Sequence, residues 1–393
     1  MRTVESGAGL TDLSLLGGPL HRLGCRLGLV RAGTDTIALG LVLGILPWTV
    51  LVALALVEGF GRVLFSMEAV GGHVRLLVAV PLFFVCETLI DPQFGAFVRG
   101  IVRSQVVPPT LQPALESEIA RIARWKDAWL PEACFLLLIV LLAWSAPNQN
   151  VFAQLSGSSG AANPSGVSET SWTSAWYWMV CMTLFRFLLL RWLWRLALWC
   201  FFLWRVSRLD LRLVPTHPDR AGGLGYLEFV HTKFAALILA ISAAGSASLA
   251  QEIARGRITF DATFPAVGLV LVADAVLFLG PLFVFSGKLR KCRVKGIRDY
   301  SVLGERYVNE FERKWLGTGA QPAEPLLGTA DIQSLADLST AVDIVRDMRT
   351  LPISSNMLIY LGVAALLPLL PLALFKYPVA ALLAKFVELV TGV

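Results

Sequence analysis

The residues best suited to chemistry lie in one polar segment, PTHPDRAGGLG, which runs from Pro215 to Gly225. Its three glycines permit backbone conformations in which several N–H groups point outward together and bind an anion. The histidine and arginine beside them add positive charge, so one predicted ligand is a phosphate or an acidic lipid headgroup. The alternative is a tight turn, framed by prolines, that docks the loop between helices. The candidate residues are His217, Asp219, Arg220, Gly222, Gly223 and Gly225.

A second pair of candidates, Asp274 and Arg186, lies inside long apolar runs. A charge at the middle of a bilayer costs at least about 2.5 kcal/mol on insertion scales, so such residues need a partner. Both fall at about the same depth, and we predict that they form an ion pair. The pair either fixes helix register or lets Asp274 take up and release a proton or cation. Glu87, Arg191 and Arg195 lie nearer the inner ends of their runs, where we expect them to reach the headgroups by snorkelling.

A third candidate is a dense basic stretch directly after the sixth apolar run. It either attracts anionic lipid headgroups at the inner face or simply keeps that loop on the inner side. Its members are Lys288, Arg290, Lys291, Arg293, Lys295 and Arg298.

Seven apolar runs of about 20 residues position these candidates. That length matches the hydrocarbon core of a bilayer, and the composition agrees, with 56% hydrophobic and 16% charged residues and a mean hydropathy of +0.66. We therefore predict an all-α, polytopic bundle of about seven spans, with helical cytoplasmic loops. The predicted spans are 36–57, 74–90, 128–146, 176–200, 234–250, 265–286 and 355–375.

Positive charge alternates strictly between the loops, with 25 Lys and Arg residues in one set and 5 in the other. The positive-inside rule then predicts a bacterial inner-membrane protein with a cytoplasmic N-terminus, and this explains the net charge of +6 without nucleic acid. The predicted partners are the bilayer and anionic headgroups at its inner face, with a homo-oligomer as a further possibility.

The predicted organisation has four parts. A cytoplasmic segment, 1–35, precedes a six-span bundle, 36–286, whose inner loops are 91–127 and 205–233. A cytoplasmic helical region, 287–354, precedes the last part, 355–393, which holds the seventh span and a terminal interfacial helix. Helical spacing of apolar residues predicts amphipathic helices within 91–127 and over 331–349.

Two internal packing features are also predicted. Gly40 and Gly44 form a small face on the first span, against which another helix can pack closely. The fifth span is rich in Ala, Ser and Gly, so we expect it at the centre of the bundle.

Motifs for enzymes, metals or cofactors are not evident. The six cysteines form no CxxC pair, and the acids of 331–347 lack the spacing of a calcium loop, so no metal or cofactor is predicted. Only His217, Asp219 and His231 approach a catalytic set, and their spacing matches no hydrolase or metalloprotease motif.

Three separated motifs give the chain a resemblance to a family of uncharacterised bacterial integral membrane proteins. They are the HPDRAGGLG loop from His217, the DIQSLADL helix from Asp331 with VRDMR from Val345, and the closing LLPLLP from Leu366. The resemblance implies a bacterial inner-membrane protein and no particular activity. Ion or small-solute transport is the function we expect first; a membrane-anchored scaffold or sensor is the alternative, and a membrane-embedded enzyme follows.

Overall fold

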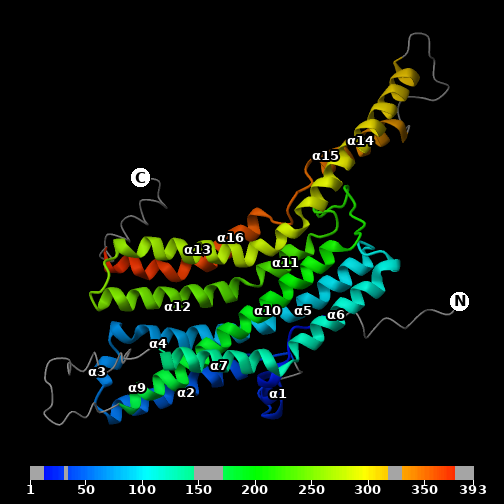
Figure 1. Ribbon diagram of the computed structural model, residues 1–393. Coiled ribbons are helices and arrows are strands. Elements are labelled where there is room, and N and C mark those ends of the chain that lie inside the picture. The colour runs from blue at the N-terminus through cyan, green and yellow to red at the C-terminus, as the bar shows by residue number, and fades with distance from the viewer. Residues whose placement is uncertain (1–12, 31–33, 146–170, 317–329, 377–393) are drawn as a thin grey trace.

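The computed structural model describes residues 13–30, 34–145, 171–316 and 330–376, and within these ranges every regular element is a helix (Figure 1). Six helices are long and apolar enough to cross a membrane, and a shorter apolar helix, α7 (Trp129–Ser145), makes a seventh. The chain is therefore an integral membrane protein with an all-α bundle, as predicted. The six long helices are Ile37–Val57, Met67–Arg103, Trp172–Arg208, Tyr226–Ala254, Asp261–Trp315 and Ser355–Phe375.

Several of these helices are built from consecutive elements. The second comprises η1 (Met67–Ala69), α4 (Val70–Val74), η2 (Arg75–Ala79) and α5 (Val80–Arg103), and the third comprises α9 (Trp172–Trp176), η4 (Tyr177–Met182) and α10 (Thr183–Arg208). The fourth joins α11 (Tyr226–Thr232) to α12 (Ala235–Ala254). The Trp-rich stretch thus forms one helix, as its length predicts.

Prolines set the pitch of the last two spans. After α13 (Phe264–Leu279) the chain tightens into the 3₁₀ segment η6 (Gly280–Phe285), and after α16 (Ser355–Leu366) into η7 (Leu367–Phe375). Pro281, Pro368 and Pro371 have no N–H to donate to a preceding carbonyl, so the regular α-helical ladder is interrupted there. These interruptions change the helix geometry within two otherwise apolar spans.

Small residues bring the central helices together. The helix α12 packs against α5, α4, α16 and η7, and this confirms its predicted central place. In α2 (Ile37–Val57), a Cβ added at Gly40 would lie 2.6 Å from Phe84 Cβ, and one at Gly44 would lie 2.4 Å from the Leu76 carbonyl oxygen. The predicted small face therefore packs directly on the second span.

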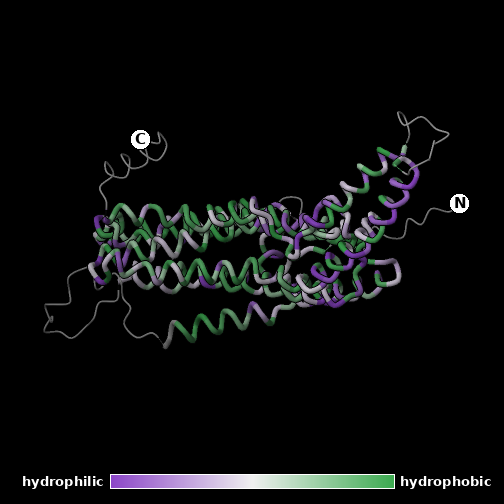
Figure 2. Tube along the Cα trace, turned by 90° about the horizontal axis from the view of Figure 1, so that it is seen from above, coloured by the Kyte–Doolittle hydropathy of each residue, from purple (hydrophilic) through white to green (hydrophobic). Residues whose placement is uncertain are grey.

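The two ends of the bundle differ. At one end, which we call the hairpin end, α14 (Ser286–Trp315) and α15 (Ala330–Arg346) pair and project away from the bundle (Figure 1). The helix α6 (Gln112–Lys126) lies at the same end of the bundle. The helices α3 (Gly61–Leu64) and α9 mark the opposite end. Polar residues concentrate on the projecting pair, whereas apolar residues dominate the bundle between the two ends (Figure 2). Both predicted amphipathic helices are therefore present as α6 and α15.

Candidate functional site

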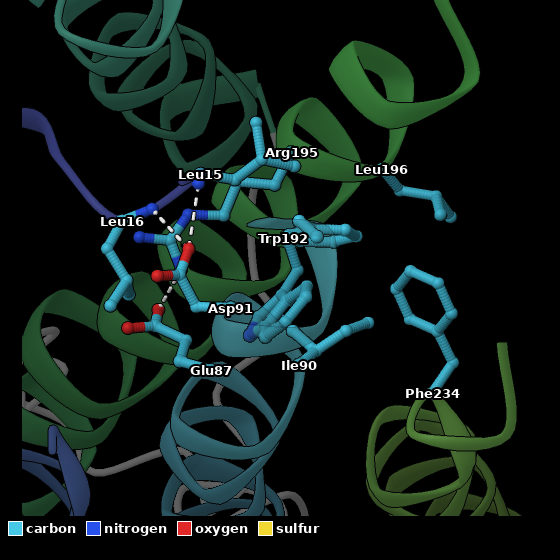
Figure 3. Close-up of a pocket in the computed structure, with 10 residues that line it drawn as sticks. Leu15, Leu16, Glu87, Ile90, Asp91, Trp192, Arg195, Leu196 and Phe234 are labelled. Carbon is cyan, nitrogen blue, oxygen red and sulfur yellow. Dashed lines mark hydrogen bonds and ion pairs between the residues drawn. The ribbon is translucent and has the colours of Figure 1, made fainter. Parts of the chain in front are cut away.

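Charged side chains meet inside the bundle in a group that we call the ionic cluster. The helix α5 contributes Glu87 and Asp91, α10 contributes Arg191 and Arg195, and α7 contributes Glu132. The spacing of four residues within α5 and within α10 places each pair on one helix face. Figure 3 shows the α5 carboxylates beside Arg195 and the backbone of Leu15 and Leu16.

Glu87 is the centre of the ionic cluster. Its Oε1 accepts a hydrogen bond from Arg191 Nη1 at 2.8 Å and also binds Arg195 Nη1. Because both arginines use the same oxygen, Glu87 Oε2 and Arg195 Nη2 have no hydrogen-bond partner in the described structure. Both residues line a cavity of about 10 Å³, which has room for about one water molecule. The glutamate and both arginines are buried, so their predicted snorkelling to the headgroups is wrong.

The segment before α1 (Gly18–Arg26) closes one side of the ionic cluster. Asp91 accepts hydrogen bonds from Ser14 Oγ at 2.9 Å and from the backbone N–H groups of Leu15 and Leu16 at 2.8 and 3.1 Å. Arg191 donates to the carbonyl oxygen of Gly17 at 3.1 Å. Leu15 and Leu16 are themselves buried, so this part of the N-terminal segment packs against the bundle.

The predicted ion pair between Asp274 and Arg186 is absent, and that prediction was wrong. Asp274 on α13 accepts a hydrogen bond from Ser242 Oγ of α12 at 3.4 Å, and no described cation lies within 4.0 Å of it. The guanidinium of Arg186 instead lies over the ring of Trp178, 5.8 Å from its centroid. Equal depth along two spans therefore did not bring these residues together, because Asp274 faces α12, whereas α10 contacts this span mainly at the following segment η6.

Asp274 remains the acid of interest because it is buried without a counter-ion among the described residues. Only 7% of the residue is exposed, and the one described hydrogen-bond donor to it is a neutral hydroxyl. A buried carboxylate that lacks a cation is stable when it carries a proton or binds a cation. The acids of the ionic cluster differ from it, since each has arginines or N–H groups around it.

The HPDRAGGLG loop forms an anion-binding nest, but its own aspartate fills it. The carboxylate of Asp219 accepts hydrogen bonds from the N–H groups of Ala221 at 2.8 Å, Gly223 at 3.0 Å and Gly225 at 2.8 Å. His217 Nδ1 lies 2.8 Å from Asp219 Oδ1. Burial alone raises the pKa of Asp219, but these N–H groups and the histidine hold it below its usual value.

The backbone of the loop explains why glycines occupy it. Gly222 and Gly223 have φ values of +66° and +98°, which favour glycine, and Arg220 also lies in the left-handed region at +54°. A Cβ at Gly223 would lie 2.5 Å from Val106 Cγ2, so the loop approaches the chain after α5 closely. The loop has the geometry of the predicted docking turn, and an external anion would have to displace Asp219.

A second motif holds this loop in place. Arg349, in the VRDMR stretch after α15, donates from Nη2 to the Asp219 carbonyl oxygen at 3.0 Å and forms an ion pair with Glu228 of α11 at 2.9 Å. Its backbone N–H donates to the Arg220 carbonyl oxygen at 2.7 Å. Two of the sequence motifs therefore meet at the base of the projecting helix pair.

The basic stretch on α14 divides into two sets. Lys288 donates to the Leu209 carbonyl oxygen, and Arg293 donates to that of Arg346 at 2.6 Å, so these two cations join α14 to neighbouring segments. The exposed set, available to headgroups or solvent, is Arg290, Lys291, Lys295 and Arg298.

The three residues nearest to a catalytic set do not converge. His231 is fully buried, where its Nε2 accepts a hydrogen bond from Trp199 Nε1 at 3.2 Å and its Nδ1 lies 2.8 Å from the Phe278 carbonyl oxygen. His217 and Asp219 bind each other in the loop. Among the described residues, no three His, Cys, Asp or Glu side chains form a group suited to a metal ion.

The fold and site define a polytopic helical membrane protein with a buried ionic cluster and a buried acid, Asp274, that has no counter-ion in the part of the chain that the structure describes. The chain matches no known protein family, no curated protein and no solved structure. The ionic cluster was not predicted as a unit, although Glu87 with Asp91 and Arg191 with Arg195 share a four-residue spacing near the same ends of two predicted spans. Those matched spacings were the available signal.

Proposed function

We propose that this chain is a bacterial inner-membrane transporter that moves a small ion or solute, with Asp274 as the group that takes up and releases a proton or cation. The observation that carries the proposal is the burial of Asp274 in a span where, within the described ranges, Ser242 Oγ is its only hydrogen-bond donor. The charged form of this carboxylate is costly without a cation. A helix movement that changes the surroundings of Asp274 therefore also changes how readily it binds a proton.

The neighbourhood of Asp274 supports such a movement. It lies at the contact between α13 and α12, where Ser242 belongs to a helix rich in Ala, Ser and Gly. Nearly two turns further along, at 3.6 residues per turn, Gly280 and Pro281 begin the 3₁₀ segment η6, where the helix can bend. The hydrogen bond to Ser242 is long enough, at 3.4 Å, to break at little cost when α13 moves.

The proposed orientation places the hairpin end in the cytoplasm. Loops at this end carry most of the Lys and Arg residues, in agreement with the positive-inside rule. The exposed cations of α14 then lie beside the anionic headgroups of the inner leaflet.

The test is ion flux in proteoliposomes that contain a trapped pH-sensitive dye, with a potassium diffusion potential as the driving force. We expect Asp274→Asn to abolish proton-coupled flux, because the amide neither binds nor releases a proton. Asp299→Asn is the matched control, since Asp299 lies on α14 with its side chain 52% exposed. Equal flux in Asp274→Asn and the parent would contradict the role of the acid, and no flux in the parent would contradict transport.

A second candidate function, holding a partner at the hairpin end, is favoured by exposed apolar residues on the projecting helices. Val302 and Leu303 of α14 are 44% and 50% exposed, and Ile332 of α15 is 45% exposed. If a second copy of the chain covers this surface, Leu303→Asp will reduce the dimer fraction seen by native mass spectrometry, whereas Glu305→Asp will not. A parent chain that is entirely monomeric in these spectra would count against this function.

A further inference from the structure

A large apolar groove lies toward the opposite end from the hairpin. It has a volume of about 390 Å³ and runs between the second span, α12 and η7. The residues of the second span that line it, Met67, Val70, Val74 and Val78, recur every three or four positions and so form one helix face. A volume of this size is typical of sites for small organic ligands rather than of packing defects.

Small side chains and prolines account for the groove. Ala243, Ala247 and Ala250 form its floor on α12, where larger residues would fill the space. On the far wall, Pro368 and Pro371 line the groove from the 3₁₀ segment η7. Since α12 packs against both α4 and η7, it separates the two walls and leaves the groove between them.

The direction of the groove and its apolar lining match the acyl chain of a lipid. From Met67 to Val78 the wall extends about 16 Å along the helix, at 1.5 Å per residue. Helix axes in spans run roughly along the acyl chains of the bilayer, so the groove is parallel to a lipid chain. Among its lining residues only Ser246 carries a polar side chain, so the groove offers almost no hydrogen bonds to a polar solute.

Basic residues lie at the end of the groove. Arg255 follows the last turn of α12, and its Nη2 donates to the carbonyl oxygen of Glu68, next to the lining residue Met67, at 3.0 Å. Lys376 directly follows the lining residue Phe375, and its Nζ lies 2.5 Å from Asp261 Oδ1. Each cation already has an acidic partner, since Arg255 also lies 3.3 Å from Glu252, so a phosphate group placed where the apolar walls end would share these cations with the two carboxylates.

We propose that the groove binds one acyl chain of a membrane phospholipid, with the phosphate beside Arg255 and Lys376. This site is separate from Asp274 and does not depend on transport. A phospholipid matches both parts of the site, because its chain fills the apolar groove while its anionic phosphate meets the basic rim.

The experiment uses the full chain in vesicles of phosphatidylethanolamine and phosphatidylglycerol that contain a phospholipid with a diazirine on its acyl chain. After illumination, mass spectrometry maps the labelled residues. We expect label on the groove residues of the second span and η7. Val78→Trp places an indole in the groove, so fewer methylene groups of the acyl chain can bind there. The groove label will fall roughly tenfold for every two methylene groups that the indole displaces. Leu77→Trp is the matched control, because Leu77 is 37% exposed and does not line the groove.

A second variant tests the rim without altering the groove. Lys376→Gln will lower the groove label when the labelled lipid carries an anionic headgroup, since one complementary charge is lost. Equal labelling of the groove and of an exposed lipid-facing residue such as Leu269, or equal groove label in Val78→Trp and Leu77→Trp, would overturn the proposal. The proposal would also be overturned if the parent chain shows no groove label and forms a dimer in native mass spectra that Val78→Trp abolishes. That result would assign the groove to a second copy of the chain.

Discussion

The ionic cluster predicts a large, residue-specific loss of stability for Glu87→Gln. In the described structure, Glu87 is the only acid within 4.0 Å of Arg195, whereas Arg191 also lies 3.5 Å from Glu132. The substitution therefore leaves the buried Arg195 without an ion-pair partner, while Arg191 keeps one. Removal of one partner from a buried pair costs about 3–5 kcal/mol, because the remaining charge stays desolvated.

Two further variants separate this effect from a general loss of polar contacts. Glu132→Gln will cost only about 1 kcal/mol, since Arg191 keeps Glu87 and its contact with Glu132 is long, at 3.5 Å. Arg195→Met combined with Glu87→Gln removes the unpaired charge, so the double variant will be less destabilised than the sum of the single variants by about 2 kcal/mol.

Reversible unfolding in mixed micelles, followed by far-ultraviolet circular dichroism as the fraction of ionic detergent increases, measures these free energies. The reasoning is refuted if Glu87→Gln and Glu132→Gln cost the same, or if the effects of Glu87→Gln and Arg195→Met simply add.

Three other predictions concern the HPDRAGGLG loop. Asp219→Ala removes the acceptor of several N–H groups, and each lost bond to a charged group costs about 1.5–3 kcal/mol. Hydrogen exchange of the peptide 215–225 will therefore accelerate. Unchanged exchange would contradict the nest geometry. Because the pKa of Asp219 is lowered, its contribution to stability is present above the usual value of 3.8 and is lost as the pH falls through the folded pKa. Exchange corrected for its intrinsic pH dependence will therefore stay slow down to about pH 4, and loss of protection near pH 6 would contradict this. Gly223→Ala forces a Cβ against Val106 at positive φ and will destabilise the chain by about 1–3 kcal/mol, measured by the same unfolding assay; a neutral effect would contradict the close approach.

The sequence by itself determined the helical elements and which of them are long and apolar enough to cross a bilayer. Apolar runs of about 20 residues specify spans through local properties alone, since every backbone group must be satisfied within its own helix. The same local logic correctly predicted the amphipathic helices α6 and α15, the single Trp-rich helix, and the close packing at Gly40 and Gly44. The glycine pattern also predicted that several N–H groups of the loop point together toward one anion.

Only the tertiary structure decided which charges meet. The depth of Asp274 and Arg186 along their spans could be counted, but the rotation of each helix and the identity of its neighbours depend on contacts between distant parts of the chain. For the same reason Glu87 pairs with Arg191 and Arg195 inside the bundle instead of reaching the headgroups. The sequence predicted a nest of N–H groups but not the group that fills it. The folded path of the loop turns the Asp219 carboxylate back onto its own backbone, so this carboxylate occupies the nest.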